Sequence, residues 1–348
     1  GYLRQMRPDV KIAFFHHTPF PSADMFSVLP WRQEIMESLM ACDVVGFHIP
    51  RYAANFAHVA HSLLNAELLE EMETWEDFSP TGVALSEMKT PVRLGWEGRE
   101  VLISAFPVGT DYQYVSGLAD DDETAKQLEG IREEIGDCKL ILSVSRTDYT
   151  KGNLETLLTY ERLFDRRPEM VGKVRLMLVS VPANRNMAVY EEVQRQIEEV
   201  AGRINGRFGR FDWQPVSLIS RAIPFKRLIG YHQAADVCWI APLCDGLNLV
   251  AQEYVAACSD GDGVLVLSEF AGVAVELPAA VMVNPFSNRS MDAAMDQALS
   301  MPEDERMARM AALRQKVQRY DIGAWMAEQR RVFAAIGGSS DAIGDVAA

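Results

Sequence analysis

The sequence predicts an α/β protein with two doubly wound lobes, and three observations carry this prediction. The chain has 348 residues, more than a single hydrophobic core usually serves. Short apolar runs of strand length recur along it, and stretches with helical spacing lie between most of them. Strands that alternate with helices are typical of parallel sheets joined by right-handed crossovers.

Each predicted strand is apolar along most of its length, as strands buried on both faces are. The predicted strands cover residues 12–15, 44–47, 101–106, 140–144, 174–181, 237–240, 264–267 and 281–283. Helices are predicted at 155–165, 189–204 and 307–317, where apolar residues recur every three or four positions. The polar, turn-rich stretch at 108–123 separates the two lobes.

Composition excludes several classes of protein. The formal net charge of -15 disfavours nucleic acids and anionic membranes as partners, because the mean field repels them. No apolar run approaches the roughly 18 residues of a membrane span. The cysteines have neither CxxC spacing nor the density of a disulfide scaffold, which favours a reducing cytoplasm: Cys42, Cys138, Cys238, Cys244 and Cys258. Residues 1–6 read as the end of a helix, so we expect further residues upstream.

The first candidate site follows the strand at 140–144, in the run SVSRTDYTKG. Ligands of open α/β sheets bind at the carboxyl ends of strands, and here Arg146 and Lys151 supply two cations. A helix after Gly152 would add free amides and its dipole, so a diphosphate fits. The alternative is that Arg146 pairs with Asp148 or another carboxylate and that Lys151 is merely solvated.

The second candidate site is PLCDGLNLVAQE, after the strand at 237–240. A helix that begins near Gly246 would place Glu253 two turns further on the same face, a spacing that suits one extended ligand. The backbone amides of Gly246 to Asn248 would meet a sugar or phosphate, and the Glu253 carboxylate would accept from ribose hydroxyls. Alternatively, Asp245 is a helix N-cap and Glu253 pairs with a base.

The third candidate site is the histidine pair in FFHHTPFP. Adjacent side chains on a strand point to opposite faces, so the pair is a poor metal site. We expect one histidine to face a cleft and the other to pack in the core. A structural role is expected for the other histidines, namely His48, His58, His61 and His232.

Together these motifs resemble the trehalose-6-phosphate synthase family of retaining glycosyltransferases, and most closely its glucosylglycerol-phosphate synthase branch. The likeness covers nearly the whole chain. It is carried by FFHHTPFP, FSVLPWRQEIMESLMACDVVGFHIPRY, SVSRTDYTKG, AGRING, PLCDGLNLVAQEYVAA and VLVLSEFAGVAVEL. Several long motifs in the right order make chance similarity improbable.

The resemblance implies the GT-B fold, in which two Rossmann-like lobes face each other across a cleft. It divides the chain into a partial amino-terminal lobe at 1–115, a nucleotide-sugar lobe at 116–322 and a final helix with its tail at 323–348, the helix returning to the first lobe. Family members begin with a strand and a glycine-rich loop that have no counterpart here, so the amino-terminal lobe is expected to be incomplete. No phosphatase-like segment follows residue 337, so a separate phosphatase is expected to act on the product.

The resemblance also implies roles for individual residues. The catalytic set would be His17 beside the transferred glucose, Arg146 and Lys151 on the diphosphate, and Asp245 on glucose hydroxyls. The nucleotide-sugar site would be completed by the amides of Gly246, Leu247 and Asn248, backbone contacts of Leu249 and Val250 to phosphate, Glu253 on the ribose, and Ile223 at the base. Arg185 would reach the acceptor's phosphate.

The implied reaction transfers glucose, with retention, from a nucleotide sugar to a small phosphorylated acceptor. ADP-glucose is favoured over UDP-glucose as donor, and glycerol 3-phosphate over glucose 6-phosphate as acceptor; the product would serve compatible-solute synthesis. The scheme requires no metal and no cofactor beyond the nucleotide sugar. Two alternatives remain: a trehalose-6-phosphate synthase, and a non-catalytic regulatory homologue that binds the nucleotide sugar.

Overall fold

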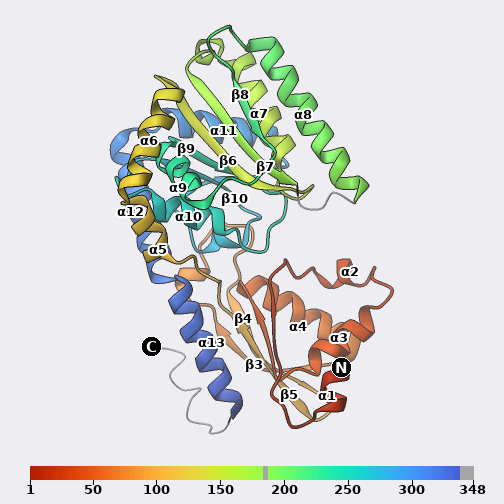
Figure 1. Cartoon of the computed structure of the whole chain (residues 1–348). Coiled ribbons are helices and arrows are strands. Elements are labelled where there is room, and N and C mark those ends of the chain that lie inside the picture. Colours follow the sequence, from red (N-terminus) through yellow and green to blue (C-terminus); the bar gives the residue numbers. More distant parts are fainter. Residues whose placement is uncertain (183–186, 338–348) are drawn as a thin grey trace. The chain divides into compact units, whose positions relative to one another are not determined.

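The computed structural model describes residues 1–182 and 187–337 and divides the chain into two compact units. Unit 1 comprises Gly1–Gly109 and Tyr320–Ala348, and unit 2 comprises Thr110–Arg319. The sequence sets the two boundaries a few residues later, after residues 115 and 322. Each unit contains one sheet with helices packed on it (Figure 1).

Unit 2 is built on a six-stranded parallel sheet in the order β11-β10-β9-β6-β7-β8. Its strands are β6 (Lys139–Thr147), β7 (Val174–Pro182), β8 (Val216–Ile219), β9 (Val237–Ile240), β10 (Val264–Ser268) and β11 (Val281–Val283). The order reverses at β6: the chain runs from β6 outward to β8, then returns to β9 on the other side. Two neighbouring strands, β6 and β9, thus send their following loops to the same edge of the sheet.

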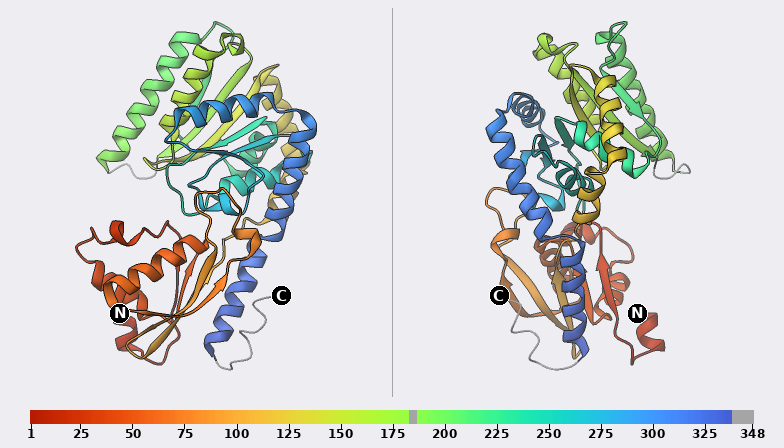
Figure 2. Two further views of the ribbon diagram at one scale, coloured as in Figure 1. Left: turned by 180° about the vertical axis from the view of Figure 1, so that it is seen from behind. Right: turned by 60° about the vertical axis from the view of Figure 1, so that its left-hand side comes forward.

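The helices of unit 2 lie on both faces of this sheet (Figure 2). On one face are α7 (Asn153–Arg166), α8 (Ala188–Phe208) and α11 (Asn288–Ser300), which enclose the main hydrophobic core with the strands. The remaining helices form a second group, in which α10 contacts α5, α9 and α12, and α6 packs on α9. These helices are α5 (Tyr112–Ala119), α6 (Asp122–Ile135), α9 (Phe225–Ala234), α10 (Leu249–Ala257) and α12 (Glu303–Arg319). Two short 3₁₀ turns, η2 (Pro168–Met170) and η3 (Gly272–Val275), complete the unit.

Unit 1 has a five-stranded sheet in the order β1-β2-β5-β4-β3. Its strands are β1 (Ala13–His16), β2 (Val44–Phe47), β3 (Glu67–Glu73), β4 (Lys89–Trp96) and β5 (Arg99–Ala105). Its helical elements are α1 (Tyr2–Met6), α2 (Ala23–Phe26), α3 (Arg32–Met40), α4 (Pro50–Leu64), η1 (Glu76–Phe78) and α13 (Ile322–Gly337). Within this unit the sheet lies between α4 and α13 (Figures 1 and 2).

The expectation of parallel sheets holds in unit 1 for β1, β2 and β5 but is wrong for β4, which runs antiparallel to both β5 and β3. The sequence gives no strand signal at β3 because ELLEEME leaves nearly every side chain exposed. Strand β4 and the short edge strand β8 are also absent from the predicted set. All eight strands that the apolar runs predict are present, with ends that shift by up to a few residues.

In the described parts of the chain, no helix is both long and apolar enough to traverse a bilayer. The expectation that the two lobes face each other across a cleft stays a prediction.

Candidate active site

Two loops meet at the carboxyl edge of the unit 2 sheet, one after β6 and one after β9. They are joined through their backbones, since the amide of Leu243 donates to the carbonyl of Thr150 at 2.7 Å. Gly152, between the first loop and α7, has a φ of +68°, and a Cβ there would collide with the carbonyl oxygen of Ala241. Glycine at this position therefore permits both the backbone conformation and the close contact between the loops.

Lys151 and Asp245 form an ion pair across the two loops. The Lys151 Nζ lies 2.7 Å from the Asp245 Oδ2, and both side chains are mostly buried, with 16% and 14% of their surface exposed. The Asn248 side-chain amide donates to the same carboxylate oxygen at 3.0 Å. Lys151 is therefore not merely solvated, and its charge lies beside the loop that carries Asp245.

Arg146, in contrast, is exposed, and its side chain forms no ion pair or hydrogen bond with any residue that the structure describes. The alternative partner, Asp148, instead accepts from the amide and the hydroxyl of Thr150, both at 2.9 Å. Its carboxylate is used to fold the loop. The guanidinium of Arg146 therefore remains available to an anion at the sheet edge.

Helix α10 begins at Leu249, so the predicted start near Gly246 is wrong. Asn248 is the N-cap: it has a φ of +91°, and its Oδ1 accepts from the amide of Ala251 at 3.1 Å. Glu253 is therefore little more than one turn into the helix. Asp245 is not the N-cap, and its carboxylate serves the contact with Lys151 instead.

In the loop before α10, two backbone carbonyls accept hydrogen bonds, whereas three backbone amides have no acceptor among the described residues. The carbonyls of Asp245 and Leu247 accept from the amides of Gly272 and Val273 in η3, at 3.0 and 2.9 Å. Within residues 1–182 and 187–337, no acceptor is recorded for the amides of Gly246, Leu247 and Asn248. Buried amides normally have partners, so these groups fit the anionic or hydroxyl oxygens of a ligand. The amides of Leu249 and Val250 lie in the first turn of α10, where helices leave N–H groups unpaired.

Glu253 is half-buried, and burial raises the pKa of its carboxyl group to about 7. Its carboxylate has no hydrogen bond or ion pair among the described residues. The alternative that Glu253 pairs with a basic side chain is therefore wrong for this part of the chain. A desolvated carboxyl group without a partner, one turn from open amides, is typical of a ligand contact.

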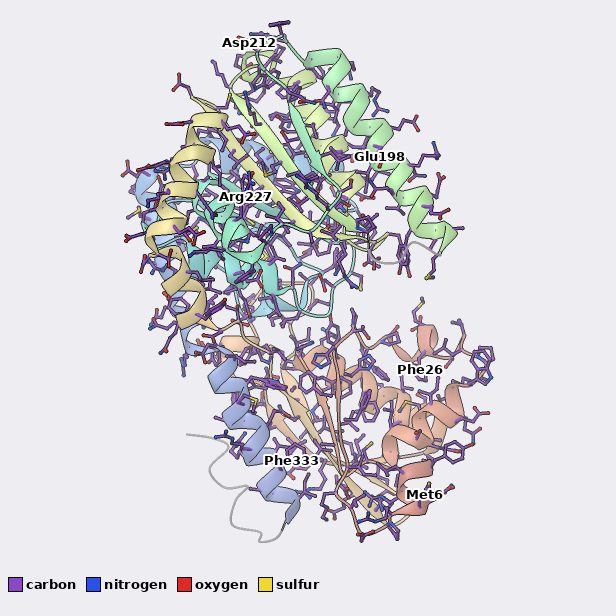
Figure 3. The ribbon with its side chains drawn as sticks, in the orientation of Figure 1. Met6, Phe26, Glu198, Asp212, Arg227 and Phe333 are labelled. Atoms are coloured by element: carbon purple, nitrogen blue, oxygen red, sulfur yellow. The ribbon has the colours of Figure 1, made fainter. Side chains whose placement is uncertain are left out.

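Ile223 precedes α9 and lines a pocket with Arg227 and Tyr231. Arg227 is labelled in Figure 3. Its guanidinium lies 5.8 Å from the centre of the Tyr231 ring. The sequence singled out Ile223 alone, although Arg227 and Tyr231 follow it at helical spacing on the first turns of α9.

His17 belongs to unit 1, whereas the residues above belong to unit 2. His17 is exposed just beyond β1. His16 is half-buried and packs on Phe20, and its Nε2 forms a hydrogen bond with the Thr18 hydroxyl at 2.9 Å. The His17 ring lies 5.2 Å from that of His48, which is buried. The proximity of His17 to the unit 2 residues stays a prediction.

Two further expectations concern the residue that binds the acceptor's phosphate and the presence of a metal site. Arg185 falls at 183–186, outside the described residues. In the part of the chain that the structure covers, no group of three His, Cys, Asp or Glu side chains is arranged to hold a metal ion.

Known proteins similar to this chain agree on one family. The model of glycosyltransferase family 20 matches residues 1–334. A glucosylglycerol-phosphate synthase from Synechocystis sp. is 46% identical over 324 residues, which cover 93% of this chain and 65% of that protein. An alpha,alpha-trehalose-phosphate synthase (UDP-forming) from Pichia angusta is 36% identical over 320 residues, covering 91% of this chain and 63% of that protein. The chain thus spans just under two thirds of the length of these relatives.

A solved structure is similar over almost all of the chain. It is an alpha,alpha-trehalose-phosphate synthase (UDP-forming) from Burkholderia xenovorans in complex with glucose-6-phosphate, with a TM-score of 0.86 and 31% identity over 97% of this chain and 70% of that chain. The architecture is thus the α/β GT-B fold with Rossmann-like units. With this fold, and with a family match over nearly its whole length, the chain belongs to glycosyltransferase family 20.

Proposed function

We propose that the full-length protein is a retaining glucosyltransferase of the glucosylglycerol-phosphate synthase type, which moves glucose from ADP-glucose to glycerol 3-phosphate. The observation that carries this proposal is the combination at the edge of the unit 2 sheet: a mostly buried Lys151–Asp245 pair at 2.7 Å, with an Arg146 side chain and three backbone amides that have no partner among the described residues. A nucleotide sugar supplies the matching groups, namely a diphosphate, sugar hydroxyls and ribose hydroxyls.

In this proposal each group meets the part of the sugar donor that its chemistry suits. Arg146 and Lys151 hold the diphosphate, and the first amides of α10 add backbone donors and the helix dipole. Asp245 accepts from glucose hydroxyls, and Glu253 accepts from the ribose. The pocket beside Ile223 takes the base.

The two cations stabilise the bond-breaking step. As the bond between the anomeric carbon and the diphosphate oxygen breaks, negative charge grows on that oxygen, and fixed cations stabilise the transition state more than the ground state. The acceptor hydroxyl attacks from the same face, and the departing phosphate takes its proton. His17 lies beside the glucose in this scheme, and neither a metal nor a further cofactor takes part.

The acceptor is assigned from similarity. Identity to the glucosylglycerol-phosphate synthase of Synechocystis is 46%, against 36% to the trehalose-phosphate synthase of Pichia angusta. We therefore favour glycerol 3-phosphate, with Arg185 on its phosphate. The product, glucosylglycerol phosphate, would be dephosphorylated by a separate phosphatase during compatible-solute synthesis in the cytoplasm.

Two alternatives remain. The protein could be a trehalose-6-phosphate synthase that uses UDP-glucose and glucose 6-phosphate, as the names of its UDP-forming relatives suggest. It could also be a homologue that binds the nucleotide sugar without turnover.

The decisive experiment gives the full-length protein ADP-glucose with either acceptor. We expect glycerol 3-phosphate to be consumed at least tenfold faster than glucose 6-phosphate, because a site shaped for three carbons places a hexose ring poorly, and such misfits cost about tenfold or more. Equal or faster formation of trehalose 6-phosphate would overturn the acceptor assignment.

Cys244 provides a readout of binding that needs no turnover. It is exposed next to Asp245, whereas Cys42, Cys238 and Cys258 are buried. Bound ADP should slow alkylation of Cys244, and the variant Cys244→Ser identifies the labelled thiol. Protection without any glucosyl transfer would select the non-catalytic alternative, and no protection by ADP or UDP would contradict a nucleotide site here.

A further inference from the structure

A chain of buried hydroxyl and amide side chains runs beneath the loop that carries Arg146 and Lys151. Thr147, Asn153 and Ser180 are at most 2% exposed and come from β6, the start of α7 and β7. Ser145 and Gln194, on β6 and α8, extend the chain at its two ends. We call these five residues the Thr147 network.

The donors and acceptors of the network fit one consistent direction. The Asn153 side-chain amide donates to the Ser180 hydroxyl at 3.2 Å, and the Ser180 and Thr147 hydroxyls lie 2.8 Å apart. The Thr147 hydroxyl donates to the Gln194 Oε1 at 3.0 Å. The Ser180 carbonyl is a second acceptor for the Thr147 hydroxyl, at 3.2 Å. Each hydroxyl has one proton, so Thr147 donates to one of these two oxygens and Ser180 donates to Thr147. Every link in this sequence uses a different proton, and neighbouring bonds polarise one another.

The network joins the two ends of the loop that carries Arg146 and Lys151. The Ser145 hydroxyl donates to the Asn153 Oδ1 at 2.9 Å, which joins the residue before Arg146 to the residue after Gly152. At the other end of the network, the Gln194 side-chain amide donates to the Ser220 hydroxyl at 3.0 Å. Ser220 lies three residues before Ile223. One hydrogen-bonded chain therefore supports both the proposed diphosphate loop and the edge of the proposed base pocket.

Arg146 lies on β6 between two residues of the network, Ser145 and Thr147. Successive side chains of a strand point to opposite faces, so anchoring Ser145 and Thr147 on one face sends Arg146 to the other. The burial of these residues agrees: Thr147 is 1% exposed, whereas Arg146 is exposed. A shift of Thr147 would turn the guanidinium of Arg146 away from the edge of the sheet.

We propose that Thr147 and Ser180 are positioning residues for glucosyl transfer, which act through the network to fix the orientation of Arg146. This inference rests on the proposed function and goes beyond it, because both residues are buried beneath the loop and are assigned no role in binding. A misplacement of a charge that stabilises the transition state should lower kcat more than it weakens the binding of the sugar donor.

The test compares two threonines in the full-length enzyme. Thr147→Val keeps the side-chain shape and removes the hydroxyl; we expect kcat to fall about tenfold to a hundredfold while the KM for ADP-glucose stays within about twofold. Thr147→Ser, which keeps the hydroxyl, should restore kcat. The control is Thr159→Val in α7. Thr159 is equally buried, but its hydroxyl donates to the carbonyl of Glu155 and accepts from the Arg162 guanidinium, outside the Thr147 network, so kcat should not change.

A double-mutant cycle separates positioning from general damage. If Thr147 acts through Arg146, Thr147→Val combined with Arg146→Ala should be no slower than Arg146→Ala alone. Ser180→Ala should reproduce the Thr147→Val defect and should not add to it. Additive losses, or an equal fall in kcat for Thr159→Val, would overturn the proposal.

Hydrogen exchange keeps the inference separate from the proposed function. If the full-length protein transfers no glucose, the proposed function fails, yet the network still predicts faster amide exchange at residues 146–152 in Thr147→Val and Ser180→Ala than in Thr159→Val. Equal exchange in the three variants would refute the network as a support of the loop.

Discussion

At the scale of single residues, the environment of a side chain distinguishes the candidate groups better than their identity does. Lys151 and Asp245 are paired and mostly buried, whereas Arg146 is exposed and unpaired in the described structure. Glu253 is desolvated without a partner among the residues described. Among the described residues, folding therefore leaves the Arg146 guanidinium and the Glu253 carboxyl group without a partner, and both would gain from a bound ligand.

The raised pKa of Glu253 gives a prediction for pH. Burial raises the folded-state pKa from its ordinary range to about 7, so the carboxyl group is mostly protonated in the free protein at lower pH. A ribose contact needs the ionised form, so affinity for the nucleotide sugar should increase by up to about tenfold from about pH 6 to about pH 8. Calorimetric titration at several pH values measures this change.

The variant Glu253→Gln is the matched control, because it keeps the shape but cannot ionise. Its affinity should be weaker at high pH and flat across the range. The sign for stability is the opposite: a carboxyl group with a raised folded pKa contributes stability that is complete below its ordinary pKa and is lost as pH rises through 7. A wild-type affinity that does not depend on pH would remove Glu253 from the site.

At the scale of elements, the starts of α7 and α10 hold the candidate site together, and both depend on a left-handed residue. Gly152 begins α7 with a φ of +68°, and Asn248 begins α10 with a φ of +91°. Asparagine tolerates this region because its side chain bonds the backbone locally, as it does here to Ala251. At Gly152 the conformation coincides with a tight contact to Ala241, and only glycine satisfies both.

We predict that Gly152→Ala destabilises unit 2 by about 2 kcal/mol or more, because it adds left-handed strain to a collision with the Ala241 carbonyl. The matched control is Gly130→Ala in α6, where a Cβ would meet nothing within 4 Å. That variant should gain about 0.5–1 kcal/mol of helix stability. Urea unfolding of the two variants tests the contrast, and a Gly152→Ala protein as stable as the wild type would contradict it.

At the scale of the whole molecule, the chain passes from unit 1 to unit 2 and returns, so the last helix belongs to the first unit. Two aromatic contacts tie this returning segment into unit 1: Tyr320 lies 4.8 Å from Phe78, and Trp325 lies 5.6 Å from Phe15, between ring centres. Tyr320 also donates a hydrogen bond to the carboxylate of Asp77. Gly109 packs against the backbone of Tyr320 and Asp321, where a side chain would collide.

Truncation after Arg319 should therefore weaken unit 1 and spare unit 2. We expect faster amide exchange in β1 and β5, because α13 no longer covers their sheet, and unchanged protection in β6 and β7. A truncation after Gly337 is the control, since it keeps α13. Equal protection of β1 and β5 in both truncated proteins would show that α13 is not part of the unit 1 core.

The sequence by itself determined the fold class, eight strands and the two loops of the candidate site. Each of these leaves a local signal: an apolar run such as 237–240, a helical period such as 189–204, or a motif that joins a strand to a helix. The strands β3, β4 and β8 and the start of α10 at Leu249 were not predicted. Strand β3 has little apolar surface, and the start of α10 depends on the conformation of one residue, Asn248.

Only the tertiary structure decided which groups are paired and which remain open. Lys151 and Asp245 lie 94 positions apart in the sequence, and Thr147 and Ser180 lie 33 apart. A residue's period and propensity describe its own element, but a contact between distant residues depends on the order and register of the strands that carry them. The neighbouring positions of β6, β7 and β9 in one parallel sheet therefore paired Lys151 with Asp245, anchored Thr147 and left Arg146 exposed.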